Sequence, residues 1–393
     1  MGKTRRNQTL SCRMGRLYAP RMADEAPVLF VPIGDNASRP FGIAARDRSC
    51  RLATNAGFEC AAAAEAGRPV LLANMRYAWD PAWLKAMRAR PHTVLTFGGE
   101  PVLAHVAAGT DPAPVAAGME QGQAPEGFEA LAAETAELSY AELRKRERPF
   151  VLPLDPADPE PVERAAYDAA YKGVTDLLTL YLWRKPAFYL TRWAARAGIA
   201  PNLVTLVGGI LCVLAFFLFW RGDYWLGILS GFIFMVLDTV DGKLARVTGA
   251  SSKWGEVFDH GIDLIHPPFW YWAWLHGLAP YGRPIEPVFA TMVLWTIVGG
   301  YVAQRIIEGL FIKRLKLEIH VWRQIDSKFR LITARRNPNM VILAGALLFQ
   351  RPDAGLKLVA LWTLVSLIFH AVRLAQATEQ RARGKRVVSW LEA

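Results

Sequence analysis

The sequence predicts a multi-domain protein in which an α-helical integral membrane domain of six transmembrane helices follows a cytosolic α/β domain. Long apolar runs dominate residues 200–376, whereas residues 1–150 have the mixed composition of a soluble protein. Strand-length apolar runs alternate with a helical pattern between residues 27 and 150, as in layered α/β folds. Five carboxylates lie between Leu237 and Leu264, although runs long enough to enter a bilayer flank them.

Six apolar segments are candidates for transmembrane helices. The first is uncharged over 19 residues, close to the roughly 20 residues that cross a bilayer. A soluble all-α protein with buried helices is the alternative, but six such runs exceed what a soluble core would use. The six segments are Asn202–Trp220, Tyr224–Leu237, Leu264–Gly282, Pro287–Ala303, Pro338–Gln350 and Leu358–Val372.

The basic residues predict how these helices are oriented. Residues 312–338 carry eight Lys and Arg and the tail from Arg373 carries five, whereas Arg221, Arg283 and Arg351 stand alone in the opposite loops. Cytoplasmic loops carry the excess of positive charge. We therefore expect a multi-pass protein of the cytoplasmic membrane of a bacterium or archaeon, with both termini and the carboxylate cluster facing the cytoplasm.

The remaining segments complete the expected organisation. Residues 1–26 should form a disordered basic N-terminus, 27–150 the α/β domain, 151–200 a linker, 201–376 the six-helix domain and 377–393 a basic cytoplasmic tail. Within the linker, residues 174–198 alternate aromatic and apolar with basic residues. That pattern is typical of an amphipathic helix lying along the membrane interface, with a plain soluble helix as the alternative.

Net charge and cysteine usage exclude several other classes. A net charge of +11 suits nucleic acid or an anionic membrane surface, and the clustering of basic residues beside apolar spans favours the membrane. We expect no nucleic-acid partner. The four cysteines are scattered without a C-x-x-C pair, so we expect neither a zinc site nor a disulfide framework, but free thiols in a reducing cytoplasm.

The acidic cluster has the spacing of a metal site. Asp238 and Asp241 are separated by three positions and Asp259 and Asp263 by four, so each pair shares one face of its helix. Four unpaired carboxylates would repel one another, and hard divalent cations with oxygen ligands remove that repulsion. A purely structural role and a proton or cation pathway are the alternatives. A pathway would not require the small and basic residues that accompany the aspartates.

The full pattern resembles the signature of the CDP-alcohol phosphotransferases, an integral membrane family of six helices. The resemblance covers roughly residues 170–380 and carries all eight fixed positions at the family's spacings. These positions are Asp238, Asp241, Gly242, Ala245, Arg246, Gly255, Asp259 and Asp263.

The resemblance implies specific roles for these residues. Asp238, Asp241, Asp259 and Asp263 would hold Mg²⁺ or Mn²⁺, two ions in all, and Asp263 would also act as the general base. The CDP moiety would contact Asp238, Gly242, Ala245, Arg246, Ser252 and Gly255, together with Pro201, Asn202 and Thr205 of the "PNLVT" opening of the first span. The family also implies a homodimer.

The implied reaction transfers a phospho-alcohol group from a CDP-alcohol to an acceptor hydroxyl and releases CMP. The donor is CDP-diacylglycerol or a CDP-polyol, and the acceptor is a polyol or polyol phosphate. Basic side chains would be needed for a phosphorylated acceptor, for which Arg335 and Arg336 are the candidates and Arg305 and Lys243 weaker ones. An ion or proton transporter and a binding-only scaffold are the competing functions.

The N-terminal half resembles the cytidylyltransferases fused ahead of such domains in inositol-phosphate-type bifunctional proteins. However, the segment "PIGDNASRPFGIAARDRS" has no G-x-G run and no Lys to cradle a nucleotide triphosphate. We therefore interpret residues 27–150 as a degenerate, inactive nucleotidyltransferase-like domain. A bifunctional enzyme whose N-terminal domain makes the CDP-alcohol remains the alternative.

Overall fold

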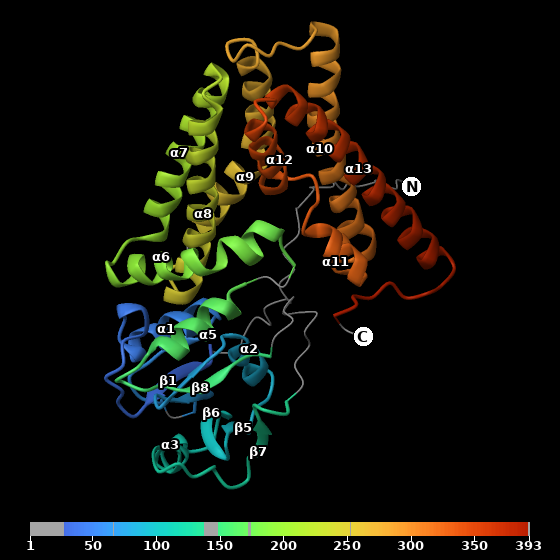
Figure 1. Ribbon diagram of the computed structural model, residues 1–393. Helices are drawn as coiled ribbons and strands as arrows, with labels where there is room; N and C mark the ends of the chain where they lie inside the picture. The colour runs from blue at the N-terminus through green and yellow to red at the C-terminus, as the bar shows by residue number, and fades with distance from the viewer. Residues whose placement is uncertain (1–26, 66, 137–147, 172–173, 252, 392–393) are drawn as a thin grey trace, which may run out of the picture.

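The computed structural model describes residues 27–65, 67–136, 148–171, 174–251 and 253–391, except for the side chains of residues 253, 254, 256 and 258–260. A sheet domain built from the first half of the chain lies at one end of the molecule, and long helices from the second half extend away from it (Figure 1). This arrangement confirms a helical, membrane-type region that follows an α/β region.

A mixed six-stranded sheet forms the N-terminal domain. Its order is β2-β1-β3-β6-β5-β7, in which β1 is parallel to β2 and β3, whereas β6 is antiparallel to both β3 and β5. Strand β7 returns parallel to β5, and a short antiparallel pair, β4 with β8, lies beside the sheet. The strands are β1 (Leu29–Ile33), β2 (Glu59–Cys60), β3 (Val70–Asn74), β4 (Tyr77–Trp79), β5 (Thr93–Phe97), β6 (Glu100–Val106), β7 (Glu129–Ala132) and β8 (Val151–Pro153).

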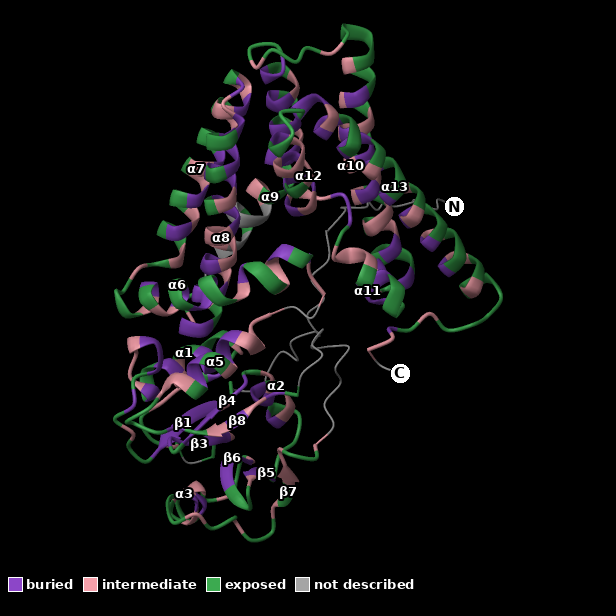
Figure 2. Ribbon diagram, viewed as in Figure 1, coloured by how far each residue is buried: buried purple, intermediate pink, exposed green. Residues whose placement is uncertain are grey.

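Alternate residues of the central strands pack on opposite faces of the sheet. Phe30 and Leu71 face a core with α1 (Ala45–Asn55) and α2 (Ala82–Arg88), whereas Leu29 and Leu72 face a second core with α3 (Pro112–Glu120). All residues of β1 and β3 are buried, as Figure 2 shows in purple. Strands buried on both faces read as continuous apolar runs, which explains why "LFVPI" and "VLLAN" do not alternate.

The local predictions for this domain are confirmed. The two apolar runs form β1 and β3, and the "DPAWLKAMRARP" pattern forms α2. The segment "HTVLTFGGEPVLAHV" forms the hairpin β5–β6, which turns through Gly98 and Gly99, both with positive φ. Glycine adopts such angles without strain, so this tight turn requires these residues.

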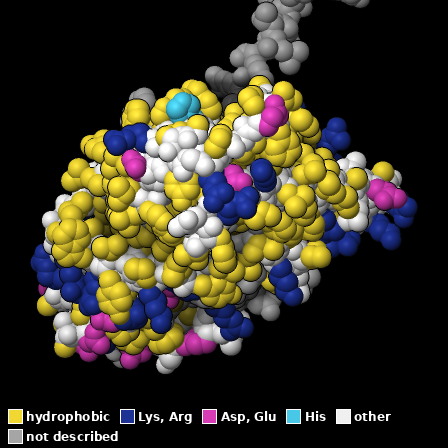
Figure 3. All heavy atoms as spheres, turned by 45° about the horizontal axis from the view of Figure 1, so that its top comes forward, with side chains coloured by type: hydrophobic (Ala, Val, Ile, Leu, Met, Phe, Trp, Pro, Cys, Tyr) yellow, Lys and Arg dark blue, Asp and Glu magenta, His cyan; other side chains and the backbone are white. Residues whose placement is uncertain are grey.

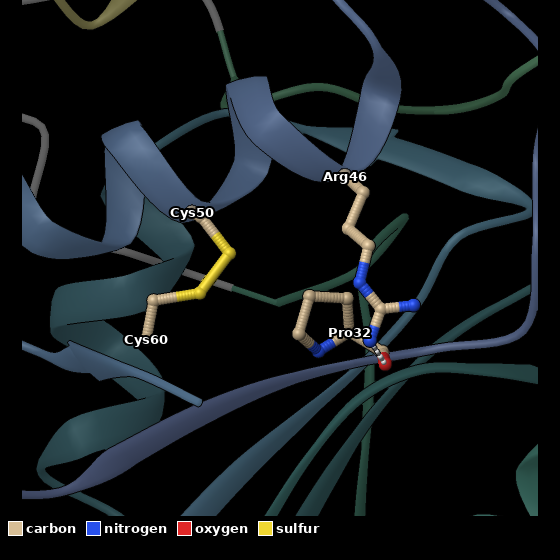
Figure 4. The surroundings of a disulfide bond; sticks show 4 residues. All are labelled: Pro32, Arg46, Cys50 and Cys60. Atoms are coloured by element: carbon tan, nitrogen blue, oxygen red, sulfur yellow. Dashed lines mark hydrogen bonds between the residues drawn. A yellow bond between two sulfur atoms is a disulfide. The ribbon is translucent and has the colours of Figure 1, made fainter. Parts of the chain in front are cut away.

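The expectation of free cysteines is wrong for two of the four. Cys50 in α1 and Cys60 in β2 form a disulfide (Figure 4), and Cys212 is free and buried. The connection between α1 and β2 folds back and brings the two Cα atoms to 5.5 Å, within the range that a disulfide spans. A spacing of ten residues does not reveal this, because it matches no local disulfide or zinc pattern.

The second half of the chain is helical. A helix of the linker, α5 (Glu160–Ala169), and a π-helical turn at Leu178–Leu182 lead to α6 (Arg184–Arg196), which lies across the base of the longer helices (Figure 1). The remaining helices are α7 (Pro201–Arg221), α8 (Tyr224–Thr248), α9 (Lys253–Gly277), α10 (Pro287–Leu315), α11 (Gln324–Arg330), α12 (Arg336–Leu348) and α13 (Pro352–Ala382), with single 3₁₀ turns at Pro40–Gly42 and Ile319–Val321.

Within the described residues, four helices are long and apolar enough to cross a membrane: α7, α8, α10 and α13. The other two predicted spans fall on α9, which contains Pro267 and Pro268, and on α12, which has 13 residues. A helix of 13 residues rises about 20 Å, less than the roughly 30 Å hydrocarbon core. Six spans therefore stay a prediction.

The apolar surface of these helices is that of a membrane protein. On α7, for example, Ile210, Val213 and Phe217 are all more than half exposed, and the outer faces of the helices are largely exposed in Figure 2. In Figure 3, hydrophobic side chains cover most of the visible face. A contiguous apolar surface of this extent indicates contact with lipid or another apolar partner.

Candidate active site

Helices α8 and α9 carry the four predicted metal-binding aspartates. Asp238 and Asp241 lie on α8 and Asp263 lies on α9. Helix α9 packs on α7, and its Trp270 and His266 contact Phe234 of α8 through their rings. These contacts hold the two acidic segments on neighbouring helices. Asp259 also lies on α9, but its side chain is outside the described part of the structure.

Arg336 connects two of the aspartates. Its Nη2 donates to Asp238 Oδ2 at 2.8 Å and its Nη1 donates to Asp263 Oδ1 at 2.7 Å. The structure thus brings the acidic side chains of α8 and α9 to a single guanidinium at the first residue of α12. Charge-assisted bonds of this kind are stronger than neutral ones, so a positive charge is held between the two carboxylates.

Asp241 lies one turn along α8 from Asp238 and contacts α7. Its side chain is buried and its Oδ2 accepts a hydrogen bond of 2.7 Å from Thr205 Oγ1. A small cavity between the helices is lined by both of these residues and by Asp238, together with Gly208, Phe234 and Ile262. Three of the predicted site residues therefore surround one cavity.

Most of the residues expected to contact the nucleotide lie at the ends of α7 and α8 that are predicted to face the cytoplasm. Pro201 and Asn202 begin α7. The Arg246 guanidinium folds back over Gly242, where a Cβ would lie 3.1 Å from Arg246 Nη2. Ala245 is half-buried beside them. Gly255 lies near the start of α9, and Ser252 is outside the described residues.

A second cavity, of about 290 Å³, adjoins Asp263 and is strongly basic. Four arginines and two aspartates contribute to its walls, together with Tyr301 and Asn337. We call it the arginine cavity; its charged lining residues are Arg305, Arg330, Arg335, Arg336, Asp176 and Asp263.

Several guanidinium nitrogens around the arginine cavity lack a hydrogen-bond partner among the described residues: Arg305 Nε, Arg330 Nη1 and Arg335 Nε. Burial, and next the positive charge of Arg335, lower the pKa of Arg330 to about 9. The lowered pKa means that the charged form of this buried guanidinium is less stable here than in water, in part because Arg335 is nearby. An anion is the ligand that would stabilise that charged form.

Glu308, His320 and His370 lie beside this cavity, with potential ligand atoms within 4.8 Å of one another. Arg305 and Arg335 both donate to Glu308 Oε1, at 2.9 and 2.6 Å. These ion pairs already neutralise the carboxylate and place two further positive charges next to the histidines. The group therefore acts as a support that orients Arg305 and Arg335 and is a poor site for a cation.

Three of the four predicted acceptor residues lie together in the structure. Arg335 and Arg336 both line the arginine cavity, and so does Arg305. Lys243 is buried on α8, with its Nζ 2.9 Å from the centre of the Tyr171 ring, and it is not part of that lining. Sequence reasoning missed Arg330, Asp176 and Tyr301; only the basic character of residues 312–338 pointed toward Arg330.

Comparison with known families gives the same result as the motif. Residues 198–377 match the family model described as CDP-alcohol phosphatidyltransferase. Residues 198–377 are a CDP-alcohol phosphatidyltransferase domain. These limits include the helices that carry the aspartates and Thr205. They also include α10 and α12, which contribute residues to the arginine cavity.

Known relatives of the CDP-alcohol phosphatidyltransferase domain include cholinephosphotransferase 1 of Gallus gallus, 37% identical over 136 residues, which cover 31% of this chain and 38% of that protein. Archaetidylinositol phosphate synthase of Pyrococcus horikoshii is 28% identical over 188 residues, covering 47% of this chain and 88% of that protein. A crystal structure of phosphatidylinositol phosphate synthase of Mycobacterium tuberculosis with CDP-DAG bound aligns with a TM-score of 0.37 and 18% identity, over 48% of this chain and 94% of that chain.

Proposed function

We propose that the protein transfers a phospho-alcohol group from a CDP-alcohol to an acceptor hydroxyl, with release of CMP, at the cytoplasmic side of a membrane. The observation that carries the proposal is the pair Asp238 and Asp263, held around one positive charge between α8 and α9. Asp263 is also 46% exposed toward the arginine cavity. A carboxylate in that position can accept the proton of a hydroxyl entering from the cavity.

The same residues suit a divalent cation. The positive charge of Arg336 already lies between the carboxylates of Asp238 and Asp263. Carboxylate oxygens are the ligands that Mg²⁺ and Mn²⁺ prefer, and four aspartates can supply them: Asp238, Asp241, Asp259 and Asp263. When bound, such ions would neutralise charge on a diphosphate. Thr205 would keep Asp241 oriented through its 2.7 Å bond. We therefore include a requirement for Mg²⁺ or Mn²⁺ in the proposal.

The experiment that tests the proposal measures CMP release by the full-length protein purified in detergent. CDP-diacylglycerol and a CDP-polyol would be offered separately, each with polyols, polyol phosphates and diacylglycerol as acceptors. We expect release from at least one pair, complete loss with EDTA and recovery with excess Mg²⁺ or Mn²⁺. Ion flux through vesicles that does not depend on a CDP-alcohol, without CMP release, would instead support a transporter.

For the acceptor, the arginine cavity favours an anionic group, so we infer a polyol phosphate. Arg305, Arg330 and Arg335 line this cavity, and each has a buried guanidinium nitrogen without a hydrogen-bond partner among the described residues. Guanidinium groups suit phosphate oxygens geometrically. The cavity opens beside Asp263, so an acceptor held by its phosphate would place a hydroxyl near that carboxylate.

Arg330→Met tests this assignment. We expect the KM for a polyol phosphate to rise about tenfold, as loss of one charge-assisted bond predicts, with the KM of the CDP-alcohol unchanged. Arg283→Met, at an exposed loop residue, is the matched control and should behave as wild type. If a neutral acceptor or diacylglycerol is the better substrate and Arg330→Met leaves its KM unchanged, the anionic acceptor is wrong.

The proposed location in the membrane is supported by the linker. Tyr181, Tyr189 and Trp193 are each more than half exposed on the π-helical turn and α6. Aromatic side chains of this type prefer the membrane interface, so we propose that this segment lies at the cytoplasmic surface of the bilayer. A homodimer and a degenerate nucleotidyltransferase-like origin of the N-terminal domain remain part of the proposal.

A further inference from the structure

The N-terminal domain contacts the CDP-alcohol phosphatidyltransferase domain at the end of the helix that carries the aspartates. Arg48 Nε of α1 donates to the carbonyl of Val247 at 2.8 Å, and Asn55 Nδ2 donates to the carbonyl of Gly249 at the same distance. The partners are 199 and 194 residues apart in sequence. Figure 1 shows α1 directly below the end of α8.

These two bonds satisfy backbone groups that α8 cannot satisfy by itself. The last four carbonyls of an α-helix have no partner within the helix, and Val247 is one of them because α8 ends at Thr248. A cation at this end also interacts favourably with the helix dipole. Arg48 is 5% exposed, and its burial lowers the pKa only to about 10, so it stays charged at neutral pH.

Helix α1 presents two different faces. Arg48, Arg51 and Asn55 follow one another at three and four positions and face α8, since such residues share a helix face. The carbonyl contacts of Arg48 and Asn55 and the close approach of Arg51 to Gly249 confirm this. Arg46 and Cys50 lie on the other face, toward the sheet, as Figure 4 shows.

Gly249 is the point of closest approach. It has φ of +69°, and a Cβ at this position would lie 2.8 Å from Arg51 Cβ. The left-handed conformation is typical of a glycine that ends a helix. Here the missing side chain also admits α1, so the turn after α8 fits against the N-terminal domain.

An apolar cluster reinforces the contact. Phe41 and Tyr167 pack with Val240, Leu244 and Val247 of α8. Glu163 anchors this cluster, because it is fully buried, accepts a bond of 2.7 Å from the Phe41 amide and pairs with Arg192 of α6 at 2.6 Å. The end of α8 is therefore enclosed by groups from α1, α5 and α6.

We propose that Arg48 and Asn55 are positioning residues for the donor site, through which the N-terminal domain fixes the turn that carries Arg246. Arg246 immediately precedes Val247, whose carbonyl Arg48 holds. This role rests on the proposed function in one respect, namely that the turn binds the CDP moiety.

The test compares Arg48→Met with Arg48→Lys and with Arg46→Met in the full-length protein. Arg46 lies on the same helix but reaches Pro32 of β1 (Figure 4), so Arg46→Met is the matched control. For Arg48→Met we expect the KM of the CDP-alcohol to rise about tenfold, as loss of a hydrogen bond from a charged donor predicts. The KM of the acceptor should stay unchanged, and Arg48→Lys should restore part of the loss.

Hydrogen exchange provides a readout that needs no turnover. The amides of Gly249 and Ala250 bond to the carbonyl of Ala245, and we expect them to exchange about tenfold faster in Arg48→Met but not in Arg46→Met. Because exchange is independent of activity, it remains interpretable if CMP release itself is never found. Exchange at the wild-type rate in Arg48→Met would overturn the inference. So would equal increases in the KM of the donor and the KM of the acceptor in Arg48→Met and in Arg46→Met.

Discussion

Asp263→Asn should lower kcat/KM for CMP release by at least about 10³-fold, because loss of a general base and of a charge-stabilising group each contribute about 10²-fold or more. The amide has the shape of the carboxylate and keeps an oxygen that can accept from Arg336 Nη1, now at 2.7 Å. The fold should therefore be preserved, and the lost quantity is the negative charge that faces the arginine cavity.

The control for this variant is Asp223→Asn. Asp223 precedes α8 at its opposite end and is 41% exposed beside Arg221, so it matches Asp263 in exposure and in having an arginine partner. We expect wild-type kinetics for it. Binding of CDP should persist in Asp263→Asn, because Asp241 and the turn after α8 are untouched. More than a tenth of wild-type turnover in Asp263→Asn would show that another group accepts the proton.

The aspartates could be predicted from sequence because their chemistry is local. Spacings of three and four place each pair on one helix face whatever the tertiary structure. Acidic groups at membrane depth are costly and usually belong to a functional site. The Arg336 contacts could not be predicted, since they join residues 73 and 98 positions apart. Arg336 was expected on the acceptor side; the structure shows that it also neutralises the aspartates.

For the fold as well, local features could be predicted from the sequence and contacts between distant residues could not. The apolar runs indicated the helices and the strands of the sheet domain, because burial leaves a period in the sequence. The contact of Arg48 with Val247 left no such trace, since one arginine on an ordinary helix has no distinguishing neighbours. The disulfide was missed for the same reason: only the fold brings Cys50 and Cys60 together.

Gly277→Ala should strongly destabilise the membrane region. Gly277 ends α9 against the end of α7, and a Cβ there would overlap the carbonyl oxygen of Phe219 and lie 3.0 Å from the amide nitrogen of Gly222. Both are backbone atoms, so no side-chain rotation can relieve the overlap. Gly222 itself has φ of +82°, and its own Cβ would lie 2.8 Å from the Gly277 carbonyl oxygen.

The two helix ends must therefore separate to admit the methyl group. That movement disrupts the nearby bond from Tyr224 Oη to the Trp274 carbonyl, at 2.6 Å, and the stacking of Trp220 on His276. Overpacking costs about 3 kcal/mol when the surroundings cannot adjust, which corresponds to a fall in Tm of roughly 10 °C for a region of this size. Thermal unfolding in detergent, followed by near-ultraviolet circular dichroism of the tryptophans, would measure it.

Gly299→Ala is the matched control, because Gly299 lies inside α10 with no atom within 4 Å of a Cβ. Alanine is preferred over glycine in a helix interior by about 1 kcal/mol, so this variant should be as stable as wild type or more so. An unchanged Tm in Gly277→Ala would mean that α7 and α9 do not approach as closely as described. Since α7 and α9 also carry Thr205 and Asp263, their separation should lower CMP release together with stability, whereas Asp263→Asn lowers release alone.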